Sequence, residues 1–404
     1  MRSFEEVEQF LYSQLPVYQK IGGTAINYKL DKIIYLCEKL GNPHKKFKSI
    51  HIAGTNGKGS VSHYTASILQ EAGYNIGLYT SPHLKRFTER IKINGTEIPQ
   101  SEVVHFVTAH EALLEKEKPS FFEYTVLMAF DYFARMEVDV AVIEVGLGGR
   151  LDSTNILTPE LSVITNIGLD HQYMLGDTIE KIAYEKAGII KKGVPVVVGE
   201  KQPEILGVFL EQVVEKESNI IWASDEPLDK TDIPYQAINK RTSLVVANTL
   251  QEFGWKILPK HINDGIANVT LNTGFRGRWQ VIHEKPLTIC DTGHNVPGLK
   301  AVNDAFSRMT YSRLTCILGM MNDKDVANML ALFPNEAQFI FCQPNLPKAI
   351  DAHTLLEIAQ QQMKTGRVIE DVNQAIEVAH HEAIDDELIF VGGSTFVVAE
   401  INSL

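Results

Sequence analysis

The chain contains the stretch Gly54-Thr55-Asn56-Gly57-Lys58-Gly59-Ser60. It follows a short strand-like run, Ser49–Ala53, and precedes a helix-like run that starts at Val61. A strand, a glycine-rich loop, a lysine, a hydroxyl group and a helix are the parts of a nucleotide-phosphate cradle. Glycines let backbone N–H groups turn toward the phosphates, and the helix N-terminus adds positive potential. The stretch therefore predicts a phosphate-binding loop in which Lys58 reaches a terminal phosphate.

The spacing within this loop differs from the common pattern G-x-x-x-x-G-K-[ST]. The first glycine stands closer to Lys58, and Gly59 separates Lys58 from Ser60. This difference argues against an ordinary kinase or GTPase and favours a particular subgroup of nucleotide-binding proteins. The alternative is a glycine turn with an exposed lysine, and the position between a strand and a helix argues against it.

Two stretches of the chain alternate β-branched runs with amphipathic runs, and each predicts a sheet covered by helices. In the first stretch, the expected strands are Ser49–Ala53, Ile76–Tyr79, Val138–Val145, Leu161–Ile167 and Val194–Gly199, and the expected helices are Val61–Ala72, Glu123–Met136 and Ile179–Ile190. In the second, the expected strands are Leu287–Cys290, Arg313–Leu318, Ala337–Phe341, Gly366–Glu370 and Glu387–Val391, and the expected helices are Val296–Met309, Asp325–Leu332, Ala352–Met363 and Val372–Glu382.

The fold class that follows is α/β with two domains, which suits a chain of 404 residues. We expect a P-loop-type, doubly wound, mostly parallel sheet domain at residues 1–282 that binds ATP. A smaller Rossmann-like α/β domain is expected at residues 283–404. In such sheets, ligands bind beyond the carboxyl ends of the strands.

The composition is that of an ordinary globular protein, with 44% hydrophobic and 22% charged residues. The formal net charge of -12 argues against a sequence-independent nucleic-acid partner, which needs a basic surface. The first six residues lack the apolar core of a signal peptide, and no run approaches the ~18 apolar residues of a membrane span. The four cysteines show no C-x-x-C spacing, so neither a zinc site nor a disulfide framework is expected. We expect a cytoplasmic monomer that acts on small molecules.

Metal-binding side chains follow three of the predicted strands. Glu144 lies at the end of the run Val138–Val145, and His171 follows the run Leu161–Ile167. Ser81 follows the run Ile76–Tyr79. A carboxylate at the end of a buried strand needs a partner. A divalent ion on nucleotide phosphates provides one, because carboxylate oxygens suit Mg²⁺. The three residues therefore predict a Mg²⁺ site beside the phosphate loop.

Each of these residues also has a structural interpretation. Glu144 would pair with Arg150 or cap a turn, since buried carboxylates are often simply paired. A lone histidine is more often structural than a ligand, and serine before proline is commonly part of a turn. Convergence of several segments on one sheet edge favours the metal site.

The motifs together resemble those of folylpolyglutamate synthases and dihydrofolate synthases, within the wider group of Mur-type ATP-dependent amide ligases. The segments that carry this resemblance are His51–Ser60, Tyr79–Leu84, Gly146–Asn155, Tyr184–Ile189, Gln236–Asn239, Gly277-Arg278 and Asp291–Asn295. The segments around Arg150 and Lys186 favour the folate branch over the cell-wall branch. A muropeptide amino-acid ligase of cell-wall synthesis is the nearest alternative.

The resemblance implies roles for individual residues. Residues 55–60 would bind the ATP phosphates, and ATP would also be held by Asn239, Arg278, Asp291 and His294. Ser81, Glu144 and His171 would together bind two Mg²⁺ ions. The pterin side of the folate substrate would be lined by Phe121, Phe122, Glu123, Leu151, Asp152 and Ser153. For Phe121 and Phe122, packing of a helix against the core is the simpler explanation of the sequence.

The implied reaction is ATP-dependent addition of L-glutamate to a folate-type carboxylate, through an acyl phosphate and with release of ADP and phosphate. Lys58, Glu144, His171 and Lys186 would be the catalytic residues. For Lys186, the resemblance implies a carbamate on the side-chain nitrogen, since an ammonium group facing Mg²⁺ would be repelled. The bland alternative is a solvated lysine near Glu180 or Glu185. Two other classes, a phosphotransferase and a non-catalytic nucleotide-binding regulator, would use a similar cradle.

Overall fold

The computed structural model describes residues 2–14, 30–322 and 324–404. The chain divides into two compact units, Met1–Gly274 and Phe275–Leu404. Residues 275–282, which the sequence analysis assigned to the first domain, belong by their contacts to the second unit.

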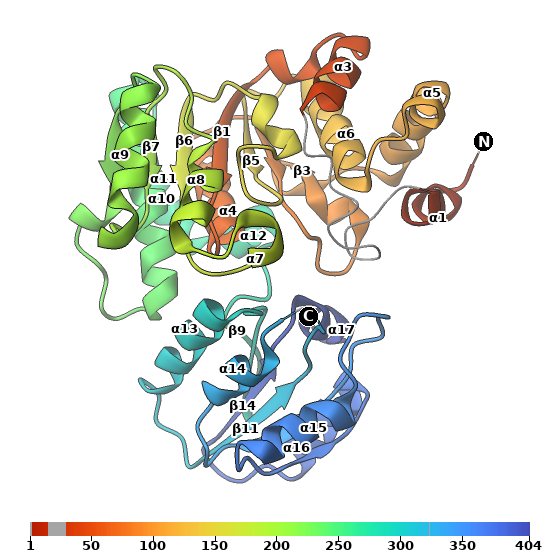
Figure 1. The fold of residues 1–404 in the computed structure, drawn as a ribbon, viewed down its shortest axis with the longest axis vertical. Coiled ribbons are helices and arrows are strands. Elements are labelled where there is room, and N and C mark those ends of the chain that lie inside the picture. Colours follow the sequence, from red (N-terminus) through yellow and green to blue (C-terminus); the bar gives the residue numbers. More distant parts are fainter. Residues whose placement is uncertain (1, 15–29, 323) are drawn as a thin grey trace. The chain divides into compact units, whose positions relative to one another are not determined.

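The first unit is built on an eight-stranded sheet with the order β4-β3-β2-β5-β1-β6-β7-β8 (Figure 1). From β2 to β8 neighbouring strands are parallel, whereas β3 and β4 add an antiparallel edge. In chain order the strands are β1 (Lys48–Ala53), β2 (Ile76–Tyr79), β3 (Ile91–Ile93), β4 (Thr96–Glu97), β5 (Val140–Glu144), β6 (Leu161–Ile164), β7 (Val196–Val198) and β8 (Ile220–Trp222).

Helices cover both faces of this sheet, because its central strands bury both sets of alternating side chains. In β5, Val140 and Val142 join one hydrophobic core, whereas Ala141 and Ile143 join a separate one. The helices are α1 (Phe4–Gln14), α3 (Asp31–Lys39), α4 (Lys58–Glu71), α5 (Gln100–Glu117), α6 (Phe121–Arg135), α7 (Gln172–Leu175), α8 (Ile179–Ala187), α9 (Leu206–Glu215), α10 (Pro234–Glu252), α11 (Pro259–Ala267) and α12 (Val269–Thr273).

The second unit has a six-stranded sheet with the order β13-β12-β11-β14-β10-β9. Its strands are parallel except for β9, which pairs with β10 in the antiparallel sense. The strands are β9 (Gln280–Glu284), β10 (Leu287–Asp291), β11 (Arg313–Leu318), β12 (Gln338–Phe341), β13 (Gly366–Val368) and β14 (Glu387–Gly392). The helices are α13 (Val296–Phe306), α14 (Val326–Ala331), α15 (Ala352–Gln361), α16 (Val372–His381) and α17 (Thr395–Glu400). Two mostly parallel, helix-covered sheets confirm the predicted fold class.

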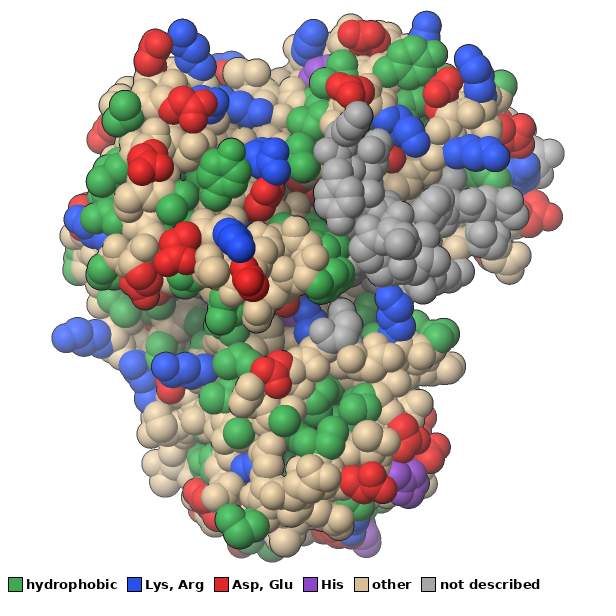
Figure 2. Space-filling model, in the orientation of Figure 1, with side chains coloured by type: hydrophobic (Ala, Val, Ile, Leu, Met, Phe, Trp, Pro, Cys, Tyr) green, Lys and Arg blue, Asp and Glu red, His purple; other side chains and the backbone are tan. Residues whose placement is uncertain are grey.

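The charged side chains and the cysteines are distributed differently over the molecule. Acidic and basic side chains are intermixed over the visible face of the first unit (Figure 2). All four cysteines are buried and free. Over the described ranges, none of the helices has the length and apolar character needed to cross a membrane.

Candidate active site

The predicted phosphate loop lies where β1 passes into α4. Two of its glycines have backbone angles that other residues rarely adopt, with φ of +148° at Gly54 and +83° at Gly57. A Cβ atom on Gly54 would lie 1.8 Å from Oγ1 of Thr165, and one on Gly57 would lie 2.3 Å from Oδ1 of Asn239. The loop is therefore closely packed on both sides. Asn239, a predicted ATP ligand on α10, lies beside the glycine that precedes Lys58.

The loop is held by the segment that follows β6. The backbone N–H of Thr55 donates to the Asn166 carbonyl at 2.8 Å, and the N–H of Asn56 donates to Oδ1 of Asn166 at 3.0 Å. The hydroxyl of Thr165 donates to the Asn56 carbonyl at 2.6 Å. These bonds preset the loop before any ligand binds. Thr165 and Asn166 were not singled out from the sequence, because both fall inside the predicted strand Leu161–Ile167, whereas β6 ends at Ile164.

Two lysines converge on one carbonyl of this loop. The Nζ atom of Lys58 donates to the carbonyls of Gly54 and Thr55, both at 3.1 Å. The Nζ atom of Lys186, on α8, donates to the same Gly54 carbonyl at 2.9 Å. Lys186 is only 4% exposed, and burial, reinforced by the charge of Lys58, lowers its pKa to about 7. Lys186 is therefore a buried group at the phosphate loop, and the interpretation as a solvated surface lysine is wrong.

Glu144 ends β5 on the neighbouring side of the loop. Its carboxylate is 4% exposed and accepts the backbone N–H of Ser81 at 3.0 Å. A Cβ atom on Gly59 would lie 3.7 Å from each of its oxygens, so the carboxylate faces the first turn of α4. Arg150 pairs instead with Glu185 at 2.8 Å. The structure thus brings Ser81, Glu144 and the phosphate loop together, and the predicted alternative of a Glu144–Arg150 pair is wrong.

His171 stands at the N-terminus of α7, after β6. Its φ of +51° is left-handed, its backbone N–H donates to Oδ1 of Asp170 at 2.9 Å, and its Nε2 lies 3.8 Å from Oδ2 of the same aspartate. Within the described part of the chain, no three His, Cys, Asp or Glu side chains cluster closely enough to hold a metal by themselves. The donor set of one carboxylate, one hydroxyl and one imidazole nevertheless fits Mg²⁺ that keeps water and phosphate oxygens as its other ligands.

The residues of α6 that were predicted to line the folate pocket lie in its first turn. Glu123 is buried and caps the helix together with Ser120, whose backbone N–H donates to the Glu123 carboxylate at 2.7 Å. The Phe122 ring covers Gly146, where an added Cβ would lie 2.4 Å from the ring. Phe121 is 6% exposed and stacks on Tyr12 with 5.3 Å between ring centroids.

The other residues predicted to line the folate pocket lie in the turn after β5, at the start of the short 3-10 helix Ser153–Ile156. Leu151 and Ser153 are half-buried, whereas Asp152 between them is buried. The Asp152 carboxylate accepts the backbone N–H groups of Leu147 and Thr154, both at 2.9 Å, and burial raises its pKa. The Thr154 hydroxyl also donates to this carboxylate, and Nε2 of the buried His51 lies 2.8 Å from that hydroxyl. Asp152 therefore shapes the glycine-rich turn that carries Gly146.

We expect Asp152→Ala to lower the free energy of unfolding by about 1–3 kcal/mol, because two backbone N–H groups and a hydroxyl lose a buried acceptor. Denaturant unfolding of the full chain would measure this loss. Asp139→Ala is the matched control, since the Asp139 carboxylate also accepts a backbone N–H, from Asn75 at 2.7 Å, but at an exposed position. Equal stability of Asp152→Ala and the wild type would contradict the capping role.

Three predicted ATP ligands belong to the second unit, around the end of β10. Asp291 is 3% exposed, and its carboxylate accepts the backbone N–H of Trp279 at 2.8 Å and of Gly293 at 2.7 Å. Nδ1 of His294 lies 3.0 Å from the carbonyl of Thr292. Arg278 is half-buried next to Trp279. The three side chains thus come from two neighbouring turns of the second unit.

Comparison with known proteins shows two family models along the chain. The Mur ligase middle domain matches residues 52–257, and the Mur ligase glutamate ligase domain matches residues 277–395. Dihydrofolate synthase/folylpolyglutamate synthase of Bacillus subtilis is 32% identical, over 99% of this chain and 98% of its own length. Folylpolyglutamate synthase of Lacticaseibacillus casei is 31% identical over 92% of each chain.

Solved structures similar to this chain carry the same kind of name as these relatives. E. coli FolC in complex with DHPP and ADP superposes with a TM-score of 0.87 at 29% identity, covering 99% of this chain and 97% of that one. The bifunctional folylpolyglutamate synthase/dihydrofolate synthase of Yersinia pestis, complexed with AMPPNP and Mn, has a TM-score of 0.84 at 28% identity, over 99% of this chain and 97% of that one. Because the likeness extends over nearly the whole chain, this protein belongs to the Mur ligase family, in its folylpolyglutamate synthase/dihydrofolate synthase branch.

Proposed function

We propose that this chain joins the amino group of L-glutamate to a folate-type carboxylate, with ATP consumed and ADP and phosphate released. The observation that carries the proposal is the phosphate loop flanked by Lys58 on one side and the buried carboxylate of Glu144 on the other. The relatives favour this reaction over the muropeptide ligase alternative, since those quoted above are named for folate chemistry.

The chemistry explains why ATP is needed. A carboxylate does not accept an amine at neutral pH, because oxide is too poor a leaving group. Transfer of the γ-phosphoryl group from ATP gives an acyl phosphate, which the glutamate nitrogen attacks, and phosphate then leaves from the tetrahedral intermediate. Phosphoryl transfer depends chiefly on positioning and charge neutralisation.

The residues of the first unit divide this work. Residues 55–60 would form the phosphate-binding loop: the N–H groups of Thr55 and Asn56 hold it to Asn166, and those of residues 57–60 would bind the phosphates. Lys58 would move from the Gly54 and Thr55 carbonyls to the transferring phosphoryl group. Ser81, Glu144 and His171 would hold Mg²⁺, which neutralises phosphate charge when bound. The Ser81 backbone N–H fixes the Glu144 carboxylate in the orientation that faces α4.

Lys186 would act as a carbamate. Its nitrogen is buried, and its lowered pKa favours the neutral amine, which is the form that reacts with CO₂. The carbamate replaces a positive charge by a negative oxygen donor beside the phosphate loop, and this removes the repulsion between Lys186 and Lys58.

The remaining predicted roles complete the proposal. ATP would also contact Asn239, and in the second unit Arg278, Asp291 and His294. The first unit would serve as the ATP-binding domain and the second unit as the glutamate ligase domain. Phe121, Phe122, Glu123, Leu151, Asp152 and Ser153 would lie on the pterin side of the acceptor. We further propose a cytoplasmic monomer without a nucleic-acid partner, in accord with the intermixed surface charge.

The direct test uses the purified full chain with ATP, Mg²⁺ and glutamate, and offers dihydropteroate and tetrahydrofolate separately. The expected result is ADP release that requires both glutamate and one of the two acceptors. ADP release without glutamate, together with a phosphorylated product, would indicate a phosphotransferase. Turnover only with a muropeptide acceptor would contradict the folate assignment.

Asn239→Ala is expected to raise the KM for ATP about tenfold, the effect of losing one or two hydrogen bonds to the nucleotide, with little change of rate at saturation. Lys58→Ala should instead lower both ATP affinity and the saturated rate, because Lys58 faces the reacting phosphoryl group. Initial rates across a range of ATP concentrations separate the two effects. Equal losses of saturated rate in both variants would contradict this division of roles.

A further inference from the structure

Arg90 is a buried cation that the proposed reaction does not yet use. It ends the short 3-10 helix η3 (Phe87–Arg90), directly before β3, and is 4% exposed. Its Nε donates to Nδ1 of His83 at 2.9 Å, and its guanidinium carbon lies 5.3 Å from the centroid of the Phe121 ring. In the part of the chain that the structure describes, its two terminal amino groups donate to no other group. A guanidinium with two undirected donor groups, almost entirely buried, is suited to an incoming acceptor.

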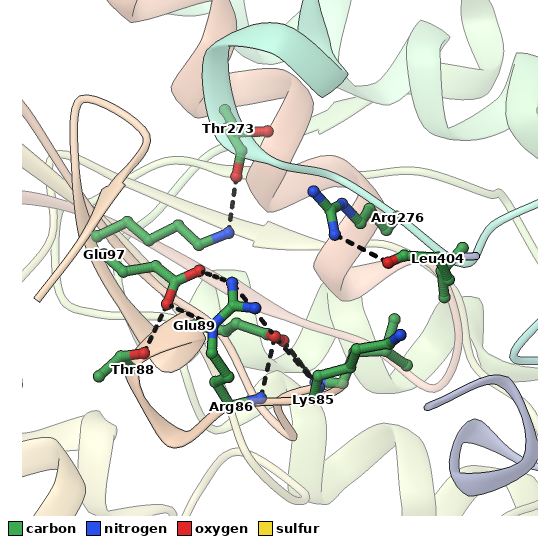
Figure 3. A network of polar contacts seen from close by, with 10 residues as sticks. Lys85, Arg86, Thr88, Glu89, Glu97, Thr273, Arg276 and Leu404 are labelled. Carbon is green, nitrogen blue, oxygen red and sulfur yellow. Dashed lines mark hydrogen bonds and ion pairs between the residues drawn. The ribbon is translucent and has the colours of Figure 1, made fainter. Parts of the chain in front are cut away.

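The carboxylates of Glu144 and Glu89 act electrostatically on Arg90, but among the described residues neither forms an ion pair with its guanidinium. His83 accepts the hydrogen bond from Arg90 through Nδ1 but adds no negative charge, since an imidazole ring is either neutral or cationic. The adjacent Glu89 carboxylate accepts the backbone N–H groups of Leu84, Lys85 and Arg86 (Figure 3). Burial of a guanidinium without a directly hydrogen-bonded anion is destabilising, and an anion bound there would offset part of that cost.

The location of Arg90 indicates which anion this is. On one side, His83 lies two residues after Ser81, whose backbone binds Glu144 at the proposed phosphoryl-transfer edge. On the other side lies Phe121, a proposed acceptor residue, with Tyr12 stacked on it and the Tyr12 hydroxyl 3.5 Å from Nε2 of His83. The guanidinium is therefore close to a proposed acceptor-binding ring and also to the segment that carries Ser81, and Glu144 of that sheet edge acts on its charge.

We propose that Arg90 binds a carboxylate of the organic substrates and thereby positions the acceptor for phosphoryl transfer. The planar guanidinium suits a carboxylate because it donates two parallel hydrogen bonds. The same chemistry could come from the acceptor or from the incoming glutamate, and contact with Phe121 favours the acceptor. This inference rests on the proposed function.

The test compares Arg90→Gln and Arg90→Lys with the wild type in the full chain. KM and kcat are measured separately for ATP, glutamate, dihydropteroate and tetrahydrofolate. Loss of a charged, two-bond contact is expected to raise the KM of the bound substrate about 10- to 100-fold in Arg90→Gln. Arg90→Lys should recover part of this loss, and the KM for ATP should stay within about twofold of the wild type, because Arg90 would not touch the nucleotide.

The identity of the affected substrate distinguishes the sources of the carboxylate. Weakened binding of tetrahydrofolate but not of dihydropteroate assigns Arg90 to the carboxylate of an existing glutamate, whereas weakened binding of both assigns it to the acceptor's reacting end. A raised KM for glutamate alone assigns Arg90 to the incoming amino acid. Each result supports a carboxylate site.

The matched control is Arg86→Gln in the same loop. Arg86 is exposed and pairs with Glu97, and both side chains are drawn in Figure 3. Its loss should leave every KM unchanged. The inference is overturned if Arg90→Gln and Arg90→Lys retain wild-type KM values for all three organic substrates. It is also overturned if the KM for ATP rises as much as the KM for the organic substrates in both variants. A wild-type chain without glutamate-dependent ADP release would instead overturn the proposed function.

Discussion

Replacing Glu144 by Gln is expected to lower the rate of glutamate addition by about 10²- to 10³-fold, the usual cost of removing one group that stabilises charge in the transition state. Glu144 is buried at the end of β5, held by the Ser81 backbone and turned toward the first turn of α4. Glutamine keeps the shape and one acceptor oxygen but removes the negative charge that holds Mg²⁺. Steady-state rates at saturating substrates, with thermal unfolding as a check on folding, would measure the effect.

Glu160→Gln provides the matched control for this substitution. Glu160 directly precedes β6 of the same sheet, and its carboxylate pairs with Lys48 at 3.6 Å on the surface. Its neutralisation should change the rate by less than about twofold, since exposed ion pairs contribute little. A near-normal rate for Glu144→Gln, with normal dependence on Mg²⁺, would contradict the assignment of Glu144 as a Mg²⁺ ligand.

Lys186→Ala is expected to reduce activity at least ~10²-fold, again the scale of one lost charge-stabilising group. The buried Lys186 nitrogen lies on the Gly54 carbonyl, so its carbamate would present oxygens at the phosphate loop. Short carboxylates such as acetate should restore part of the activity, because they supply the missing oxygen donor in the space left by the side chain. The measurement is the rate of each variant against acetate concentration.

Lys191→Ala tests whether this rescue is specific. Lys191 is another partly buried lysine, whose Nζ donates to the Asn155 carbonyl at 2.7 Å and whose pKa is lowered by burial to about 8. Its removal should lower stability without making activity depend on acetate. Full activity of the wild type in CO₂-depleted buffer, with an unmodified ammonium at Lys186 in a metal-loaded structure, would rule out the carbamate.

The sequence predicted the elements whose hydrophobic pattern is strong. The strands Ile76–Tyr79 and Arg313–Leu318 have the expected bounds, and Leu161–Ile167 was too long only because its last residues turn away to hold the phosphate loop. The longest missed element is α10 (Pro234–Glu252). It buries Gln236, Asn239, Thr242 and Ser243 along with its apolar residues, so alternation of polar and apolar residues does not mark its inward face.

In the candidate site, too, some features follow from the sequence pattern and others do not. That Glu144 ends a buried strand follows from the β-branched run before it, and its position beside the phosphate loop follows from parallel pairing of β1 with β5. The partners of Asp152 could not be predicted, because its carboxylate accepts backbone N–H groups whose direction depends on the surrounding turn. The partner of Glu123 was missed although Ser120-x-x-Glu123 is the sequence signature of a capping box. Arg90 was missed for a related reason, since burial of an arginine depends on aromatic residues distant in the sequence.

The close approach of Glu144 to Gly59 bears on how sequences of this kind can vary. A methyl group at position 59 would make ordinary van der Waals contact with both Glu144 oxygens, so alanine fits there, whereas a longer side chain would have to turn away from the carboxylate. In evolutionary terms, positions 59 and 144 form one constraint. Because Gly59, between Lys58 and Ser60, has no side chain, the Glu144 carboxylate at the end of β5 can lie close to it. Loss of the acid would free the position to accept larger residues.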